Sequence, residues 1–342
     1  MGNVVTTQYL RQLSLIVADP SGAGIELGAL RVVFEVRRGD TQTPNSCDCR
    51  VYNLSTATSN VLRHRGASEF TQLSLKVAYQ GQPLAQIFYG SIKQVRQGRE
   101  DQKNSYIAIT AADGDEAYNF APVAFTLAAG STPQNAVTSM LSAMAQATLG
   151  SPTGGSGGQP ITQGYSPTLN QNRSIRGRVF YPTCRDELRD LAASQDCTWS
   201  IQEGKLTFIP KTGYIPGPPV LITPSTGLIG VPEQTQNGLS VRVLLNPAIK
   251  IGQTIKLDST DINQLRFGID TQSVASNLSL QQGAAKQNGD GLYYVMRAEH
   301  FGDTRGTAWY TDLTCLAVDA TVPPPSSVAQ AAIAPANAIP RY

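Results

Sequence analysis

The chain has 342 residues, 15% of them charged, and a formal net charge of +2. This length suffices for two or three domains with a sizeable core. The near balance of Lys+Arg (27) and Asp+Glu (25) excludes the strongly basic composition with which proteins bind nucleic acid without reading its sequence.

The sequence carries no signal for export or for a membrane. No apolar stretch approaches the roughly 20 residues that a membrane-spanning helix needs, so we expect no stable membrane insertion. Met1 is followed by polar residues instead of a basic start and an apolar run. This beginning predicts no signal peptide and synthesis in a cytoplasm.

Residues 1–121 predict an antiparallel β domain. Alternating apolar residues indicate six short strands, at 13–17, 30–37, 47–52, 73–79, 87–95 and 107–111. Strands at such close spacing favour a barrel or a sandwich over a βαβ fold. The alternation slips after Ile92, which predicts a bulge. A short helix is expected from Ser55 to Arg63, with Ser55 as its cap.

Residues 122–222 predict an α+β module inserted between two β regions. Thr132-Pro133 is typical of a helix start, and the helical pattern that follows ends at Gly150. The Gly/Ser-rich stretch 151–160 predicts a flexible loop. A second helix is expected from Cys184 to Gln195 with Thr183 as its cap, followed by a hairpin that turns at Gly204.

Residues 223–320 predict a second β domain. Asn237-Gly238 indicates a turn into a strand at 239–245, which Asn246-Pro247 ends. Further strands are expected at 255–257, 293–298 and 309–318, with a loop from His300 to Gly306. The segment 265–280 stays ambiguous. The Pro/Ala-rich residues 321–342 predict an extended tail. The fold class is therefore mainly β with an α+β part.

The five cysteines predict neither a disulfide framework nor a zinc site. Their number is odd and they are widely dispersed. Cys47 and Cys49 share a strand face, but no two further ligands stand nearby. We expect all five to be small buried residues. They are Cys47, Cys49, Cys184, Cys197 and Cys315.

Candidate catalytic groups are few. His64 lies in a basic turn, and we expect it to be solvated. His300 is expected to hydrogen-bond to loop backbone or to Asp303. Carboxylates cluster twice, at Asp113, Asp115 and Glu116 and at Asp186, Glu187 and Asp190. A pair of carboxylates can hydrolyse cell-wall sugars, but the sequence favours a tight turn for the first cluster and helix-start charge for the second. No metal or cofactor motif is present, so neither is expected.

Several segments together resemble one family. They are Val51–Ser55, Phe88–Ile92, Ala112–Asp115, Gly227–Pro232, Val241–Pro247, Ile249–Gly252, and Gly302–Gly306 before Trp309-Tyr310. Their order along nearly the whole chain is similar to that in baseplate hub proteins of contractile-tailed phages, the Mu-like and T4-like hub group.

The resemblance implies two tail-tube-like antiparallel β-barrel domains, with the α/β insertion module between them. It implies a non-enzymatic structural protein and a homotrimer that adapts a sixfold tail tube to a threefold central spike. Its partners would be the tail tube protein, the central spike protein and other baseplate proteins, with DNA only in transit through an axial channel. It would lie at the tail tip of the virion after assembly in the host cytoplasm.

Assembly contacts are expected in the stretch from Thr223 and around the loop after His300. The candidates are Leu228, Ile229, Val231, Leu245, Asn246, Pro247, Phe301, Asp303, Arg305 and Trp309. Two alternatives stay open: a cell-wall-degrading tail-associated hydrolase, and the hub of a phage-derived contractile injection machine.

Overall fold

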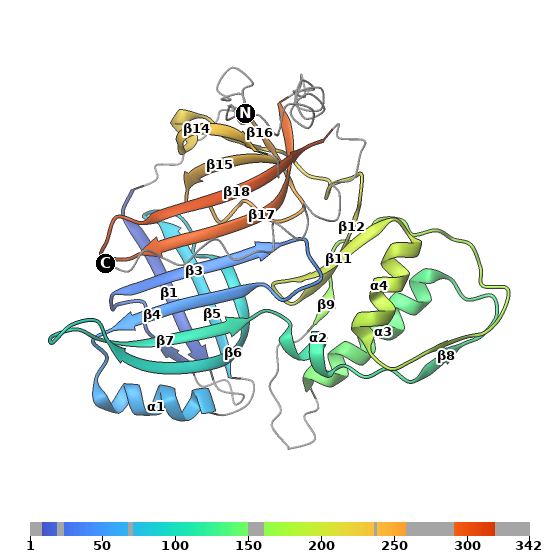
Figure 1. Cartoon of the computed structure of the whole chain (residues 1–342), viewed down its shortest axis with the longest axis horizontal. Helices are drawn as coiled ribbons and strands as arrows, with labels where there is room; N and C mark the ends of the chain where they lie inside the picture. Colours follow the sequence, from blue (N-terminus) through green and yellow to red (C-terminus); the bar gives the residue numbers. More distant parts are fainter. Residues whose placement is uncertain are drawn as a thin grey trace, which may run out of the picture.

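The computed structural model describes residues 9–18, 24–67, 71–149, 161–235, 238–257 and 291–318 (Figure 1). Three segments named above fall outside these residues: the predicted Gly/Ser loop 151–160, the ambiguous segment 265–280 and the predicted tail 321–342. No helix in the described part is long and apolar enough to cross a membrane.

Seven strands form the first β region, and they confirm the predicted alternation. They are β1 (Arg11–Ala18), β2 (Gly24–Glu26), β3 (Val32–Gly39), β4 (Ser46–Tyr52), β5 (Gln72–Tyr79), β6 (Ala85–Arg99) and β7 (Ser105–Ala112). Neighbours pair antiparallel in the order β3-β4-β7-β6-β5-β1-β2. The predicted bulge is present in β6, where the register with β7 shifts between Ile92 and Gln94.

These strands enclose one apolar core. In Figure 1, β1 and β5 cross behind β3, β4 and β7. Side chains from both layers, such as Leu15, Val36, Leu75 and Ile109, are buried in a single cluster. Helix α1 (Thr56–Ala67) lies beside β6, and its first turn is capped by Ser55, whose Oγ accepts from the Thr58 N–H at 3.1 Å.

The middle of the chain forms a separate lobe of helices and short strands. Its elements are α2 (Asp115–Phe120), β8 (Phe125–Leu127), α3 (Pro133–Leu149), β9 (Thr162–Gln163), β10 (Arg178–Phe180), α4 (Cys184–Ser194), β11 (Cys197–Gln202) and β12 (Lys205–Pro210). The lobe has its own core, which includes Met140, Leu188 and Trp199. Both predicted helices are present, and the Thr183 Oγ1 caps α4 by accepting from the Asp186 N–H. Helix α2 was not predicted.

The last part of the chain returns to β structure. Its elements are β13 (Val220–Leu221), a 3-10 turn η1 (Pro224–Thr226), β14 (Leu228–Thr235), β15 (Gly238–Leu244), β16 (Thr254–Lys256), β17 (Leu292–Asp303) and β18 (Trp309–Ala317). They pair in the order β14-β15-β18-β17, and β16 pairs with both β17 and β13. Val241, Val295 and Leu313 belong to the core that these strands enclose.

One strand pair joins the two β regions. Strand β17 pairs antiparallel with β3 from Arg297 opposite Gly39 to Asp303 opposite Val33. The strands of both regions therefore form one 13-stranded sheet, in which all pairs except β13–β16 are antiparallel. The structure is mainly β, as predicted, but its sheet is continuous across the two regions.

The loop predicted from His300 to Gly306 is shorter than expected. Residues 300–303 belong to β17, and the turn to β18 occupies 304–308. The prediction was wrong at its start because the inward-facing positions of β17 after Ala298 are His300 and Gly302, which give no apolar alternation in the sequence.

Candidate functional site

The structure exposes some of the predicted assembly contacts at the edge strand β14. Ile229 is 37% exposed and Val231 is 53% exposed. The register of β14 on β15 shifts between Ile229 and Glu233, so Gly230, Val231 and Pro232 stand opposite a single residue. Such a bulge turns side chains outward at a sheet edge. These two apolar residues are therefore available to a partner.

Two other predicted contacts are core residues. Leu245 is fully buried in the first β core. Trp309 is 2% exposed and packs edge-on against Phe34, with ring centroids 5.6 Å apart. The guanidinium of Arg11 lies over the Trp309 ring at 5.4 Å. Both residues stabilise the packing of β18 on the first β region.

Asp303 and Arg305 lie at the turn between β17 and β18. The Asp303 carboxylate accepts from Arg31 Nη2 at 2.9 Å and from the Arg305 N–H at 2.9 Å. Burial opposes ionisation, but these bonds outweigh it and lower the pKa of Asp303. Arg11 of β1 donates to the carbonyl oxygens of Asp303, Gly306 and Thr307. The turn is thus fixed from two sides, while the Arg305 side chain is exposed.

The remaining candidates are half-buried. Leu228 packs against the third core. Asn246 ends β15 as predicted, since its Oδ1 accepts from the Ala248 N–H at 3.0 Å, and Pro247 follows it. Phe301 lies against Tyr310 with ring centroids 5.1 Å apart.

A buried ionic junction, formed by Arg38, Glu203 and Lys250, connects three parts of the chain. Arg38 lies in β3, Glu203 in the β11–β12 turn, and Lys250 in the loop before β16. Glu203 Oε1 accepts from Arg38 Nη1 at 2.7 Å and from Lys250 Nζ at 2.5 Å. The side chain of Arg38 is only 3% exposed. The ionic junction therefore fixes the middle lobe against both β regions.

Two amide side chains and one further carboxylate surround this ionic junction. Gln202 accepts from Arg38 Nη2 at 3.2 Å and from Asn45 Nδ2 at 3.0 Å. The Asp113 carboxylate accepts from the backbone N–H groups of Glu203 and Gly204, at 2.6 and 3.1 Å. Asp113 therefore holds the β11–β12 turn in place, which the sequence alone did not indicate.

The ionic junction favours the charged form of its acid, Glu203. Burial alone would raise the pKa of Glu203, but the charges of Arg38 and Lys250 outweigh it and the pKa is lowered. Burial and the charge of Arg38 lower the pKa of Lys250. His300 lies fully buried nearby, and burial together with the two cations lowers its pKa to about 3. His300 is therefore neutral at physiological pH.

The histidines show no arrangement typical of catalysis. His300 Nδ1 bonds to Thr311 Oγ1 at 2.8 Å, across the β17–β18 pair. The expected bond to Asp303 or to loop backbone was wrong, because His300 lies inside the strand and its side chain points into the interior. His64 is exposed, as predicted, but it lies in α1 and not in the expected turn, because the helix continues to Ala67.

The carboxylates Asp115 and Glu116 are buried beside β6. Asp115 pairs with Lys93, and its Oδ1 accepts from Asn119 Nδ2 at 3.0 Å. Glu116 Oε1 accepts from Ser91 Oγ at 2.8 Å. Burial raises the pKa of Glu116 to about 7. These contacts attach α2 to the first β region.

The second carboxylate cluster lies at the start of α4. Asp186 pairs with Arg189 at 3.1 Å, and Glu187 pairs with Arg178 at 3.6 Å. Asp190 is exposed. The first two residues contact the helix start and β10, as expected for charges that stabilise a helix N-terminus.

All five cysteines are free and buried, which confirms their expected role as small core residues. Among the described residues, no group of three or more His, Cys, Asp or Glu side chains is placed to hold a metal ion.

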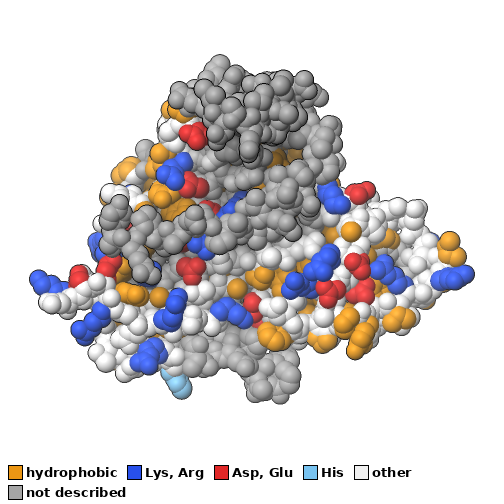
Figure 2. Space-filling view, in the orientation of Figure 1, with side chains coloured by type: hydrophobic (Ala, Val, Ile, Leu, Met, Phe, Trp, Pro, Cys, Tyr) orange, Lys and Arg blue, Asp and Glu red, His pale blue; other side chains and the backbone are white. Residues whose placement is uncertain are grey.

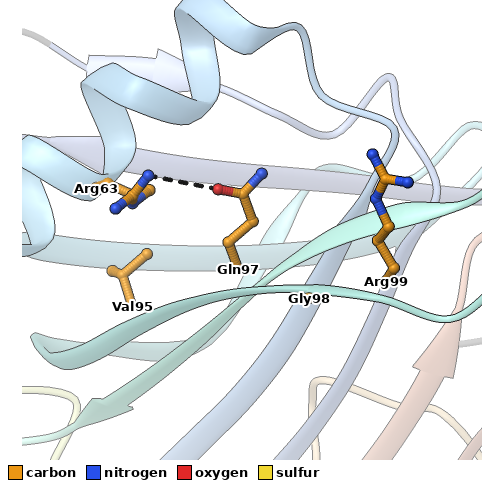
Figure 3. Close-up of a pocket in the computed structure, with 5 residues that line it drawn as sticks. All are labelled: Arg63, Val95, Gln97, Gly98 and Arg99. Carbon is orange, nitrogen blue, oxygen red and sulfur yellow. Dashed lines mark hydrogen bonds between the residues drawn. The ribbon is translucent and has the colours of Figure 1, made fainter.

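A shallow hollow lies between α1 and β6 (Figure 3). It is lined by Arg63, Val95, Gln97, Gly98 and Arg99. Arg63 donates to Gln97 at 3.5 Å. None of the candidate carboxylates or histidines lines it. On the face shown in Figure 2, acidic and basic side chains are interspersed rather than gathered into one field.

Comparison with known proteins finds similarity in structure only. No protein-family model matches the sequence. No curated protein matches it either. Solved structures that share its fold do exist, at sequence identities of about a tenth or less.

Two prophage or bacterial tail proteins match over nearly their whole length. The 43 kDa tail protein of prophage MuSo2 from Shewanella oneidensis has a TM-score of 0.53 at 8% identity, covering 91% of this chain and 98% of that one. A tail protein from Neisseria meningitidis has a TM-score of 0.52 at 11% identity, covering 92% and 99%. A chain of the lidless PdpA–VgrG complex has a TM-score of 0.51 at 7% identity, covering 93% and 67%.

The resemblance predicted from the sequence is thereby confirmed in the fold. The chain has the fold of phage tail proteins across both β regions and the middle lobe, since the match covers about nine tenths of it.

Proposed function

We propose that the chain is a structural hub of a contractile phage tail, placed at the baseplate and acting without catalysis. The observation that carries this proposal is the whole-length match: a tail protein of 43 kDa is covered over 98% of its length by this chain. The ordered hub-like segments of the sequence agree with it. Because fold similarity alone does not give function, the exposed surfaces of the molecule support the rest of the proposal.

The edge strand β14 supports assembly into a ring. An edge strand with exposed apolar residues invites association, and closed rings of identical subunits cover such edges. Ile229 and Val231 meet this description, and Arg305 adds an exposed charge at the β17–β18 turn. In our proposal three copies form a homotrimer, and each copy contributes two barrel-like β regions.

Six similar β regions would then face a sixfold tail tube, while the threefold ring receives the central spike. The tail tube protein, the spike protein and other baseplate proteins are the partners. An axial channel passes DNA during ejection into the host cell. The boundaries 1–121, 122–222, 223–320 and 321–342 are our proposed division of each copy.

The continuous sheet and the ionic junction suit such a role. An adaptor transmits force between a tube and a spike, so its parts have to keep fixed positions. Strand pair β3–β17 and the ionic junction couple both β regions and the middle lobe through buried contacts.

Co-assembly tests the proposal. The purified chain is mixed with a tail tube protein from the same genome, and the complex is measured by native mass spectrometry. A complex of three copies of this chain on a tube ring supports the hub. Six copies in the complex, as in a tube layer, would overturn it.

The hydrolase alternative has a direct test in peptidoglycan release. The chain and its single variants Asp113→Asn, Asp115→Asn, Asp186→Asn and Glu187→Gln are assayed side by side. We expect no activity from any of them, because these carboxylates bond to structural partners. Activity of the parent chain that one variant abolishes would favour the hydrolase.

The third candidate is the hub of a phage-derived injection machine. It shares the architecture proposed here, and the genes that neighbour this one distinguish it from a phage tail.

A further inference from the structure

The middle lobe carries a two-stranded ribbon, formed by residues 121–131 and 174–184. Strand β8 pairs with β10, and the pairing continues on both sides. At one end the Cys184 N–H donates to the Ala121 carbonyl at 3.0 Å. At the other the Gly130 N–H donates to the Ser174 carbonyl at 2.7 Å. The ribbon is therefore a defined element longer than its assigned strands.

One face of this ribbon is apolar and exposed. Val179 and Tyr181 are 69% and 71% exposed, and Ile175 in the bend before β10 is 93% exposed. Side chains alternate along a strand, so Val179 and Tyr181 share the outer face. Phe180 between them is buried and stacks on Phe125 at 4.7 Å. The ribbon therefore has one apolar face that packs into the core of the lobe and a second apolar face that is exposed.

Exposed apolar rows of this kind mark interaction sites in soluble proteins. The ribbon row, defined as Ile175, Val179 and Tyr181, is accompanied by exposed arginines at 173, 176 and 178. Of these three arginines, only Arg178 forms an ion pair among the described residues, with Glu187. A partner should therefore offer apolar side chains beside an acidic one.

The β14 edge of the same chain offers that chemistry. Ile229 and Val231 are exposed there, and the Glu233 side chain beside them is exposed as well. Pro232 and the bulge prevent regular strand addition at this edge, so a partner would contact side chains rather than extend the sheet. In Figure 1 the ribbon and β14 lie at opposite ends of the molecule, so the two surfaces cannot contact each other within one copy.

We propose that the ribbon row of one copy packs on the β14 edge of the next copy, and that this contact closes the ring. It rests on the homotrimer proposed above and names its interface. Two different patches that meet head to tail form a heterologous contact, which closes when the rotation fits. Val179 and Tyr181 cover Ile229 and Val231, and the arginines at 173 and 176 approach Glu233.

Cysteine crosslinking tests the contact. All five native cysteines are buried, so engineered surface cysteines are the reactive ones. Three variants of the full chain are treated with a short bis-maleimide: Val179→Cys, Val231→Cys and the double variant. Native mass spectrometry of each untreated sample gives its oligomeric state.

The head-to-tail geometry predicts a specific pattern. Each single variant stays uncrosslinked, a mixture of the two gives a linked pair, and the double variant gives a ladder that ends at the trimer. The control pair Gln97→Cys with Val231→Cys stays uncrosslinked, since Gln97 is exposed elsewhere, on β6.

Other outcomes overturn the inference in distinguishable ways. If the double variant is a trimer by native mass spectrometry but stays uncrosslinked, the homotrimer proposal holds and this interface is wrong. Crosslinking of Val179→Cys with itself also removes it, because that result means a symmetric contact. A monomer at every concentration removes both the interface and the homotrimer.

A charged variant measures how much the apolar contact contributes to the stability of the trimer. Val179→Asp places a charge on an exposed position, which leaves the melting temperature of the isolated chain nearly unchanged. In the interface it places that charge against the apolar side chains of Ile229 and Val231, and we expect the trimer to dissociate at about tenfold higher concentration. An unchanged dissociation concentration contradicts the proposal.

Discussion

Glu116 shows how a buried acid is used for attachment rather than for chemistry. It is 3% exposed and bonds to Ser91 of β6, which places α2 against the first β region. Burial raises its pKa from 4.5 to about 7. Catalytic acids often have a raised pKa, but Glu116 does not line the hollow between α1 and β6.

The shifted pKa of Glu116 predicts a pH effect on stability. Between pH 4.5 and 7 the unfolded chain ionises this group while the folded chain keeps its proton, so the stability contributed by neutral Glu116 falls as pH rises. Glu116→Gln keeps an acceptor for Ser91 and removes the titration. We expect the variant to be more stable than the parent by about 1–3 kcal/mol at pH 8 and similar at pH 4.

Urea unfolding at both pH values measures the difference. The comparison with the parent chain cancels the titration of all other groups. Equal stability of the two chains at pH 8 would contradict the raised pKa.

For Glu203 in the ionic junction, the same change from Glu to Gln is expected to lower stability instead of raising it. Glu203→Gln leaves the cations Arg38 and Lys250 close together without a counter-charge. Because Arg38 is buried, we expect a loss of about 3 kcal/mol. The control Asp196→Asn removes a distant and exposed ion pair with Lys211, and should change stability by less than about 0.5 kcal/mol.

Denaturant unfolding of both variants provides the measurement. A loss for Glu203→Gln as small as that of its control would mean that the ionic junction does not couple the lobes energetically.

At the residue scale the sequence predicted types of environment better than partners. The burial of the cysteines follows from their number and spacing. The partner of His300 was missed, because Thr311 becomes its neighbour only through the pairing of β17 with β18. Asp113 lies in the tight turn that was expected, but its carboxylate also holds the turn at Glu203, which is far away in sequence and was not predicted as its partner.

At the scale of elements, the pair β3–β17 is held by close packing as well as by backbone bonds. Gly302 lies where a Cβ atom would stand 2.3 Å from the Phe34 ring and 3.0 Å from Trp309. Gly302 is therefore required for the close contact between the strands. The segment Gly302–Gly306, which is part of the family resemblance, thus has a packing role in this chain.

Gly302→Ala tests this packing. A methyl group at such a distance forces Phe34 or the strand to move, and we expect a loss of about 1–3 kcal/mol. The matched control Gly217→Ala adds a methyl group where no atom lies within 4 Å, and should leave stability nearly unchanged. Thermal unfolding compares the two. Equal melting temperatures would show that the strands adapt at no cost.

Local patterns explain which elements were predictable. Helix α3 begins at Thr132-Pro133 with helical spacing, helix α4 is capped by Thr183, and β3 and β7 alternate strictly, so each follows from neighbouring residues. Helix α2 has six residues and begins at Gly114 without a side-chain cap, so it gives no comparable signal. The β3–β17 pair joins residues more than 250 positions apart, and no local pattern specifies it.

At the scale of the molecule, the chain combines a continuous sheet with two exposed apolar surfaces at its ends. The sheet and the ionic junction favour a stiff subunit, and the ribbon row and β14 edge favour a head-to-tail ring. In our proposal, the fold that the chain shares with phage tail proteins places this ring in a tail. The proposed hub unites these features in one assembly.

The most direct measurement is a cryo-EM reconstruction of the tail tip in purified particles, with the density of this chain identified. We predict three copies in one ring, each giving two β regions to a pseudo-sixfold layer against the tube, with the spike below. Absence of the chain from the particle, or six copies stacked along the tail, would contradict the hub.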